Sequence, residues 1–173
     1  ERDFNGQVTG SISNYQNLIA LTFSKQVKPN FSLGVNIKYL QHNLANIQSS
    51  GVGFDLGALL LWQSNLRFGL VVENVGLSNS WLSGNYWKKF GFSGSSNIDK
   101  FPVNIKLGTA VLSRWLSGQN QFLLALDLEK REHQSLQFHL GGEYWYKNLL
   151  AARAGLNRGD LTLGVGIKQK LAH

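Results

Sequence analysis

The 173-residue chain has no cysteine, no methionine and only two prolines. Without cysteine, it can form no disulfide and offers no thiolate to a metal or a substrate. No stretch approaches the roughly 18 consecutive apolar residues of a membrane-spanning helix. A Gly-x-Ser-x-Gly elbow and a phosphate-binding glycine loop are also missing, which excludes the enzyme classes built on those motifs. Because position 1 is not methionine, we expect Glu1 to follow a processing or excision event that removed any signal peptide.

Alternation of apolar and polar residues is the dominant pattern in the chain. In residues 31–39, FSLGVNIKY, the odd positions are apolar or aromatic and the even positions are polar, charged or glycine. This period of two is typical of a β-strand with one apolar face. The pattern recurs almost to the C-terminus, and it predicts strands over residues 4–12, 19–24, 31–39, 53–62, 66–73, 103–115, 122–129, 136–144, 150–157 and 161–168.

Turn signals separate these strands, and no segment has helical periodicity. We expect turns at 13–16, 28–30, 63–65, 117–120, 147–148 and 158–160, and loops at 42–50, 76–102 and 131–135. About ten strands joined in sequence by hairpins predict one all-β domain over residues 1–173, folded as an up-and-down antiparallel β-barrel.

Two kinds of barrel share this pattern and differ in which face meets water. A lipocalin-like soluble barrel has its apolar face inside, whereas a membrane barrel turns its apolar face to lipid and its polar face to the lumen. Many of the 19 glycines fall on the polar face, among them Gly34, Gly108 and Gly141. On a solvent face such glycines lose chain entropy for no contact, but inside a narrow barrel they make room for large neighbours. Glycine placement therefore favours a transmembrane β-barrel in a bacterial outer membrane.

Charges of both signs also fall on the polar face, although the net charge of the chain is +7. Mixed signs are expected where partly buried charges must offset their desolvation. The basic residues are spread over many strands and form no single stripe with aromatics, so we expect no nucleic-acid partner. We predict a lumen charge network formed by Lys38, Asp55, Arg67, Glu73, Lys106, Asp127, Glu129, His139, Glu143, Arg153 and Lys168.

The lengths of the connections alternate in the same sense. Counting from 28–30, every second connection is short, while 42–50, 76–102 and 131–135 are longer. Outer-membrane barrels have short periplasmic turns and longer outside loops. Segment 76–102 is the longest, and it is rich in glycine, serine, asparagine and aromatics. Its candidate partner-binding residues are Trp81, Tyr86, Trp87, Lys88, Lys89, Phe90 and Phe92, which could instead pack into the barrel mouth as a plug.

Several blocks resemble the PorV/PorQ family of outer-membrane barrels, which are distantly similar to the FadL long-chain fatty-acid transporters. These blocks are SLGVNIKYL, GVGFDLGALL, LRFGLVVENVG and, most specifically, FLLALDLEK followed by LQFHLGGEYWYKNLLAARAGLN. The likeness covers most of residues 8–168. The Asn-Pro-Ala-Gly-like opening of the family has no counterpart before Phe4, and the chain lacks the family's terminal aromatic residue. Family barrels have about fourteen strands, within the range of single-chain outer-membrane barrels. We therefore expect this chain to be a portion of such a barrel or a shortened relative.

The resemblance implies a non-enzymatic role as a docking, shuttle or structural component of a type IX-like secretion system or of envelope assembly. Its partners would be outer-membrane lipid and other envelope or secretion proteins. Two alternatives remain open: a FadL-like transporter of hydrophobic small molecules, and a soluble lipocalin-like binder. An apolar lumen patch would favour the transporter, and a lumen filled by salt bridges would count against it.

No constellation of residues predicts a catalytic site, a metal site or a cofactor. His139 and Glu143 lie on one strand face roughly 13 Å apart, too far to share a metal. Asp127 and Glu129 lie roughly 7 Å apart, a spacing that a glycosidase pair could use, but charge balance in a lumen explains them better. Residues 158–160 spell Arg-Gly-Asp, an adhesion tripeptide, and we interpret them as a hairpin turn.

Overall fold

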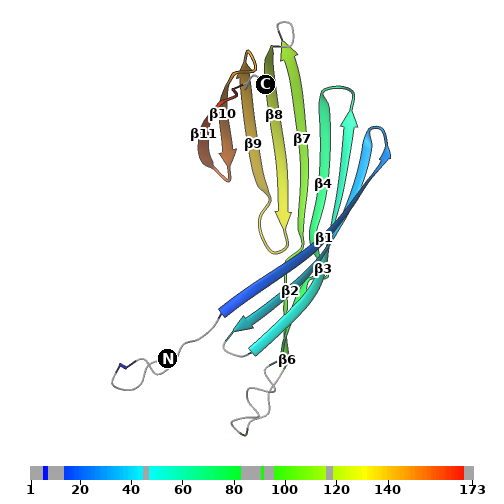
Figure 1. Cartoon of the computed structure of the whole chain (residues 1–173), viewed down its shortest axis with the longest axis vertical. Coiled ribbons are helices and arrows are strands. Elements are labelled where there is room, and N and C mark those ends of the chain that lie inside the picture. The colour runs from blue at the N-terminus through cyan, green and yellow to red at the C-terminus, as the bar shows by residue number, and fades with distance from the viewer. Residues whose placement is uncertain are drawn as a thin grey trace. The chain divides into compact units, whose positions relative to one another are not determined.

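The computed structural model describes residues 6–7, 14–44, 47–82, 91, 96–115 and 119–169, and in this part of the chain all regular structure is β-strand (Figure 1). The strands are β1 Asn14–Lys28, β2 Phe31–Leu44, β3 Ile47–Trp62, β4 Leu66–Val75, β5 Ser78–Leu82, β6 Ser96–Lys100, β7 Asn104–Trp115, β8 Asn120–Arg131, β9 Gln137–Tyr146, β10 Leu150–Asn157 and β11 Asp160–Ile167.

These strands form one large antiparallel sheet of 11 strands, and the described residues do not close it into a barrel. Nine strands follow one another in the order β1-β2-β3-β4-β7-β8-β9-β10-β11. The hairpin of β5 and β6 lies off this path and is attached through β3. The prediction of an all-β, up-and-down antiparallel sheet is therefore confirmed, while β1 and β11 remain edge strands.

Most predicted strands are confirmed, and several are longer than the alternation indicated. The expected turn at 13–16 is wrong from Asn14 onward, because β1 already begins there. The loop at 42–50 is also wrong. Here β2 runs to Leu44 and β3 begins at Ile47, since polar residues continue the strands past the point where the apolar alternation ends. The strand expected over 4–12 lies outside the described residues, apart from Gly6 and Gln7.

The segment predicted as a loop over 76–102 contains the β5–β6 hairpin, which pairs Ser78 with Lys100. The chain leaves β4 through two left-handed residues, Asn74 (φ 63°) and Gly76 (φ 70°). It then runs so close to β3 that a Cβ on Gly51 would lie 1.9 Å from the carbonyl oxygen of Ser78. Real Cβ atoms never approach a backbone oxygen so closely, so glycine at position 51 is what allows β5 to pair with β3.

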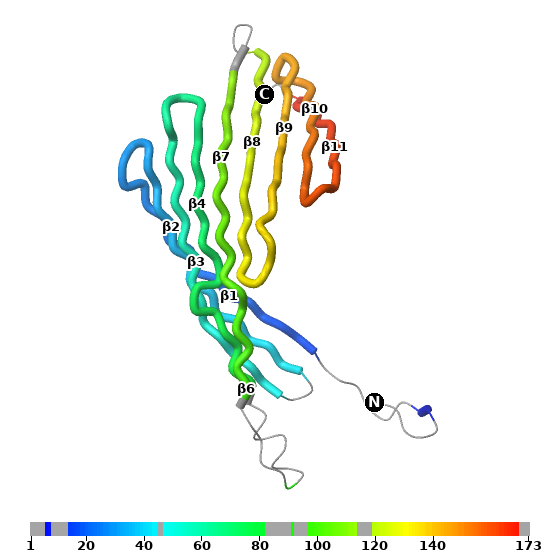
Figure 2. Tube along the Cα trace, turned by 180° about the vertical axis from the view of Figure 1, so that it is seen from behind, coloured from blue at the N-terminus to red at the C-terminus, as the bar shows by residue number. Residues whose placement is uncertain are grey.

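The chain forms two compact units, and β1 to β4 each contribute residues to both. Unit 1 comprises residues 1–23, 35–55 and 74–101. Unit 2 comprises residues 24–34, 56–73 and 102–173. In unit 2, β7 to β11 lie side by side as consecutive hairpins (Figure 2).

The pairing register of unit 2 defines two faces. Facing residues alternate between an apolar face and a polar face in every pair from β4 to β11. The apolar face carries Phe68, Leu70, Leu107, Val111, Leu124, Leu126, Phe138, Leu140, Tyr144, Leu156, Leu163 and Val165. The polar face carries Arg67, Gly69, Glu73, Asn104, Lys106, Gly108, Asp127, Glu129, His139, Glu143 and Arg153.

Exposure is inverted relative to a water-soluble sheet. On the apolar face Leu163 is 78% and Val165 89% exposed, whereas on the polar face Glu129 is 8% and Asn104 2% exposed. The same inversion runs along β2, where Leu33, Val35 and Ile37 are exposed and the residues between them are half-buried. The described residues include only three buried hydrophobic side chains, those of Leu40, Leu77 and Ala151.

Candidate functional site

The candidate site is the polar face, where the structure gathers eight of the eleven predicted lumen residues into three separate clusters. Asp55 pairs with Lys38 in unit 1. In unit 2, Glu129 and Glu73 share one network with Lys106 and His139, and Glu143 pairs with Arg153 in another. Alternation along each strand was enough to place these side chains on one face, as the sequence predicted.

The Asp55 cluster belongs wholly to unit 1. Lys38 Nζ lies 2.6 Å from Asp55 Oδ1 and also donates to Asn74 Oδ1 at 2.7 Å. Asn36 donates to the other carboxylate oxygen of Asp55 at 2.9 Å, and the backbone N–H of Asn74 donates to Oδ1 at 2.9 Å. Every charged atom of this pair therefore has a hydrogen-bonding partner, which is what a half-buried ion pair requires to offset its desolvation.

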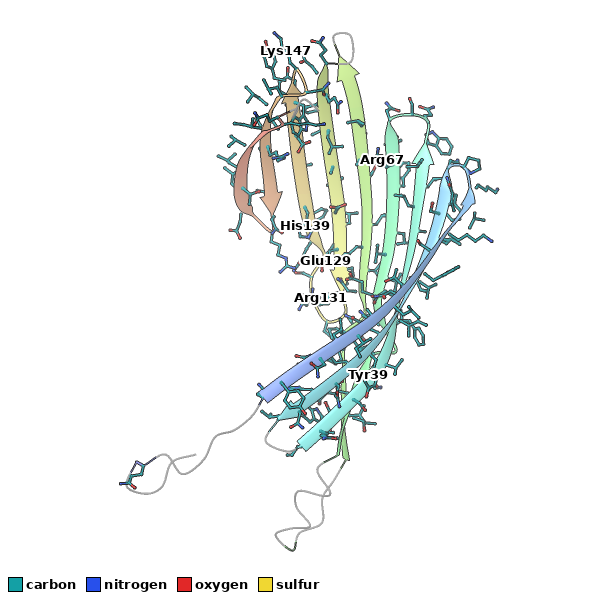
Figure 3. The ribbon with its side chains drawn as sticks, viewed as in Figure 1. Tyr39, Arg67, Glu129, Arg131, His139 and Lys147 are labelled. Carbon is teal, nitrogen blue, oxygen red and sulfur yellow. The ribbon has the colours of Figure 1, made fainter. Side chains whose placement is uncertain are left out.

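The Glu129 cluster lies where β8 ends, beside the start of β9 (Figure 3). Glu129 Oε1 accepts from Asn104 at 2.9 Å and from Arg131 at 3.2 Å. Its other oxygen lies 3.7 Å from Arg158 Nη2 and 3.3 Å from His139 Nε2, and the imidazole nitrogen lacks the alignment of a hydrogen bond. One nearly buried carboxylate thus joins β8 to β7, β9 and the β10–β11 turn.

Asn104 extends this network to a second carboxylate. Its side-chain amide donates 2.9 Å hydrogen bonds to both Glu129 Oε1 and Glu73 Oε2. Glu73 in turn forms a 2.9 Å salt bridge with Lys106. On the far side of Glu129, His139 Nδ1 lies 2.7 Å from Asn157 Oδ1. The network therefore runs across the polar face from β4 to β10.

The third cluster lies near the other end of β9. Glu143 accepts hydrogen bonds from Arg153 Nε and from Trp145 Nε1, and the Arg153 guanidinium lies over the Trp145 ring at 5.6 Å from its centroid. Gly166 leaves room for this guanidinium, because a Cβ there would lie 2.8 Å from Arg153 Nη1. The cluster is partly exposed, so its contribution to stability is about 1 kcal/mol or less.

Three predicted lumen residues join no cluster in the described part of the chain. Arg67 and Lys168 are exposed near the short turns and form no ion pair there. Asp127 faces His139 in the register but folds over Gly108 instead, whose missing Cβ would lie 2.3 Å from Asp127 Oδ1.

The neutral and turn residues that complete the clusters were not among the predicted lumen residues. Asn74 and Asn104 each bridge two charged groups, Asn36 donates to Asp55, and Arg131 and Arg158 pair with Glu129. Arg131 shares its parity with Glu129 and could have been found from alternation. Asn74 and Arg158 could not, because both have positive φ (63° and 53°) at the end of a strand or in a turn, where alternation carries no information.

The Arg-Gly-Asp tripeptide forms a hairpin turn, as predicted. Arg158 and Gly159 both have positive φ between β10 and β11, and Asp160 is the first residue of β11. The Arg158 guanidinium is oriented to Glu129. This arrangement gives the tripeptide a structural role.

Of the predicted partner-binding loop, only Trp81 is described. It lies in β5 and donates a 2.6 Å hydrogen bond to Asp99 of β6. Its ring packs in a T-shaped arrangement with that of His42, with 5.0 Å between the ring centroids. Tyr86, Trp87, Lys88, Lys89, Phe90 and Phe92 lie outside the described residues.

No protein family, curated protein or solved structure matches the chain. Within the described residues, no group of three or more His, Asp or Glu side chains is arranged to hold a metal ion. The described residues also contain no helix long and apolar enough to cross a membrane.

Proposed function

We propose that the chain forms the wall of a transmembrane β-barrel in a bacterial outer membrane, with its apolar face against lipid and its polar face lining the lumen. The protein would act as a non-enzymatic docking, shuttle or structural component of secretion or envelope assembly. The membrane placement is argued from the faces of the sheet, and the role from the resemblance to PorV/PorQ barrels.

The inverted exposure of the two faces is the observation that carries the membrane placement. Each Leu, Ile, Val or Phe left in water forgoes roughly 1.5–3 kcal/mol relative to burial. More than ten such side chains share the apolar face of unit 2. Their exposure would cost more than the roughly 5–15 kcal/mol by which proteins are stable, so another apolar phase must cover this face. Lipid can do so along the whole sheet.

The ion pairs support placing the polar face inside. Arg158 reaches Glu129 from beyond β9, and Lys38 on β2 reaches Asn74 beyond β3, so polar side chains link strands that are not neighbours. Such links draw the polar face together and shelter it. A lipocalin-like binder would need the opposite curvature, with Leu126 and Leu140 sheltered and Glu129 in water.

The chain's role within the membrane has two candidates. A FadL-like transporter would favour an apolar interior, but the polar face carries three charge clusters, which counts against it. Docking in secretion or envelope assembly needs no such interior. Deletion of the gene in its host separates the two: loss of protein secretion or surface assembly supports docking, and loss of long-chain fatty-acid uptake supports transport.

Refolding tests the membrane placement. The chain is diluted from urea into buffer, into detergent micelles and into phosphatidylcholine vesicles, and its β-structure and resistance to protease are measured. We expect native-like protection only with detergent or lipid, and in a particle whose strands close, through β1 with β11 or through further strands. A stable, protected monomer in buffer alone would contradict the proposal and favour the soluble binder.

A further inference from the structure

The short connections of unit 2 form one continuous end of the sheet. The turns β1–β2, β3–β4 and β9–β10 all lie there, with the end of β7 and the start of β8, and Figure 2 shows the β3–β4 and β9–β10 turns at the same end of the unit. Hydrogen bonds of 2.8–2.9 Å tie these connections to neighbouring strands: Leu61 N to Asn30 O, Leu112 N to Asn65 O, Lys147 N to Asn120 Oδ1 and Lys168 N to Leu149 O.

This end is strongly basic, while the opposite end of the unit is not. It carries exposed lysines that form no ion pair with any described residue, a set that we name the basic rim: Lys25, Lys28 and Lys147. Glu143 is the carboxylate nearest the rim among the described residues, and Arg153 already occupies it. The acidic residues Glu73, Glu129, Glu132 and Asp160 lie toward the other end, together with the cations Lys106, Lys130, Arg131 and Arg158. Lys106 pairs with Glu73, and Arg131 and Arg158 pair with Glu129.

Several exposed aromatic side chains lie near the basic rim. Trp62 is 53% exposed beside the β3–β4 turn, and the apolar-face neighbours Phe122 and Tyr144 are exposed below the β9–β10 turn. Tyr146 lies at that turn, and Lys147 Nζ lies 5.2 Å from its ring centroid (Figure 3). From the hydrocarbon core of a bilayer to its headgroups, membrane proteins typically present aliphatic, then aromatic, then cationic side chains.

We propose that the basic rim binds the phosphate groups of anionic glycerophospholipids in the leaflet that surrounds the short turns. The inference rests on the proposed membrane placement, since only an embedded sheet brings this end to headgroup level. Three exposed lysines that form no ion pair with a described residue, beside exposed aromatics, complement lipid phosphates. The opposite end, where four acidic residues match four cations, offers no such excess.

The test uses the full chain in vesicles and the quenching of its tryptophans by brominated lipid. The ratio of quenching by brominated phosphatidylglycerol to that by brominated phosphatidylcholine measures the preference for the anionic headgroup, and Trp62 lies close to the rim. The rim variant is Lys28→Gln with Lys147→Gln. The matched control is Lys130→Gln, which removes one positive charge from an exposed position at the opposite end of unit 2 and is compared per lysine removed.

We expect the wild type to prefer phosphatidylglycerol and to lose this preference at high salt. The rim variant should lower the preference by up to about five-fold per lysine, and the control should leave it unchanged. Equal preference in wild type and rim variant, or an equal drop in the control, would overturn the inference.

Insertion into pure phosphatidylcholine separates the two proposals. If the chain inserts there without any anionic preference, only the basic rim fails; if it does not insert at all, the membrane placement fails with it.

Discussion

The two faces of unit 2 are built from the same strands and differ in almost every physical property. From β7 to β11, one face presents aliphatic and aromatic side chains to the surroundings, and the other holds charged and amide side chains in hydrogen-bonded clusters. In a water-soluble sheet the apolar face would be the sheltered one. Because the apolar face is the exposed one, it must be stabilised by the surroundings of the sheet and not by the sheet's own core.

The largest expected effect comes from charging the apolar face. Leu126→Lys places an ammonium group on the apolar face of β8. If that face meets lipid as proposed, the change should cost about 2–4 kcal/mol of folding free energy in vesicles. The preceding residue, Ala125, lies on the polar face, so Ala125→Lys should cost far less folding free energy. Urea titration of both variants in phosphatidylcholine vesicles measures the difference. Equal losses would remove the distinction between the faces.

A smaller effect is expected from breaking the polar face. Glu129→Gln keeps the shape of the side chain but removes the charge that Arg131 and Arg158 face, and we expect a loss of about 1–3 kcal/mol. Glu132→Gln is the control, because Glu132 is exposed and accepts a 3.3 Å hydrogen bond from Val103 N. The same titration reads both, and similar stabilities would show that the cluster contributes little.

The smallest effect sharpens the role of glycine on the polar face. Gly69 and Gly108 face each other across β4 and β7, yet a Cβ on Gly69 would meet nothing within 4 Å and one on Gly108 would meet Asp127. Gly69→Ala should stabilise the folded chain by about 0.5–1 kcal/mol, because alanine lowers the conformational entropy of the unfolded chain. Gly108→Ala should gain less or lose, because Asp127 must move. A larger gain for Gly108→Ala would contradict this account of Asp127.

The sequence predicted what depends on a period of two and missed what depends on backbone irregularity. Alternation placed Lys38 with Asp55 and Glu73 with Lys106 on one face, and the structure pairs them. Alternation could not find the β5–β6 hairpin, because the strands are only five residues long and their pairing depends on Asn74 and on the missing side chain of Gly51. Alternation predicts a loop over the polar segment 42–50 for a related reason, because backbone pairing continues there although the apolar residues stop.

The most direct test of the account is the accessibility of successive residues of β8 in a membrane. Because the chain has no cysteine, single cysteines can be introduced at positions 122 to 129 and labelled with a water-soluble maleimide in vesicles. We predict that positions 123, 125, 127 and 129 react and that 122, 124, 126 and 128 are protected by lipid. Labelling without alternation, or alternation with the even positions reactive, would contradict the assignment of the apolar face to lipid.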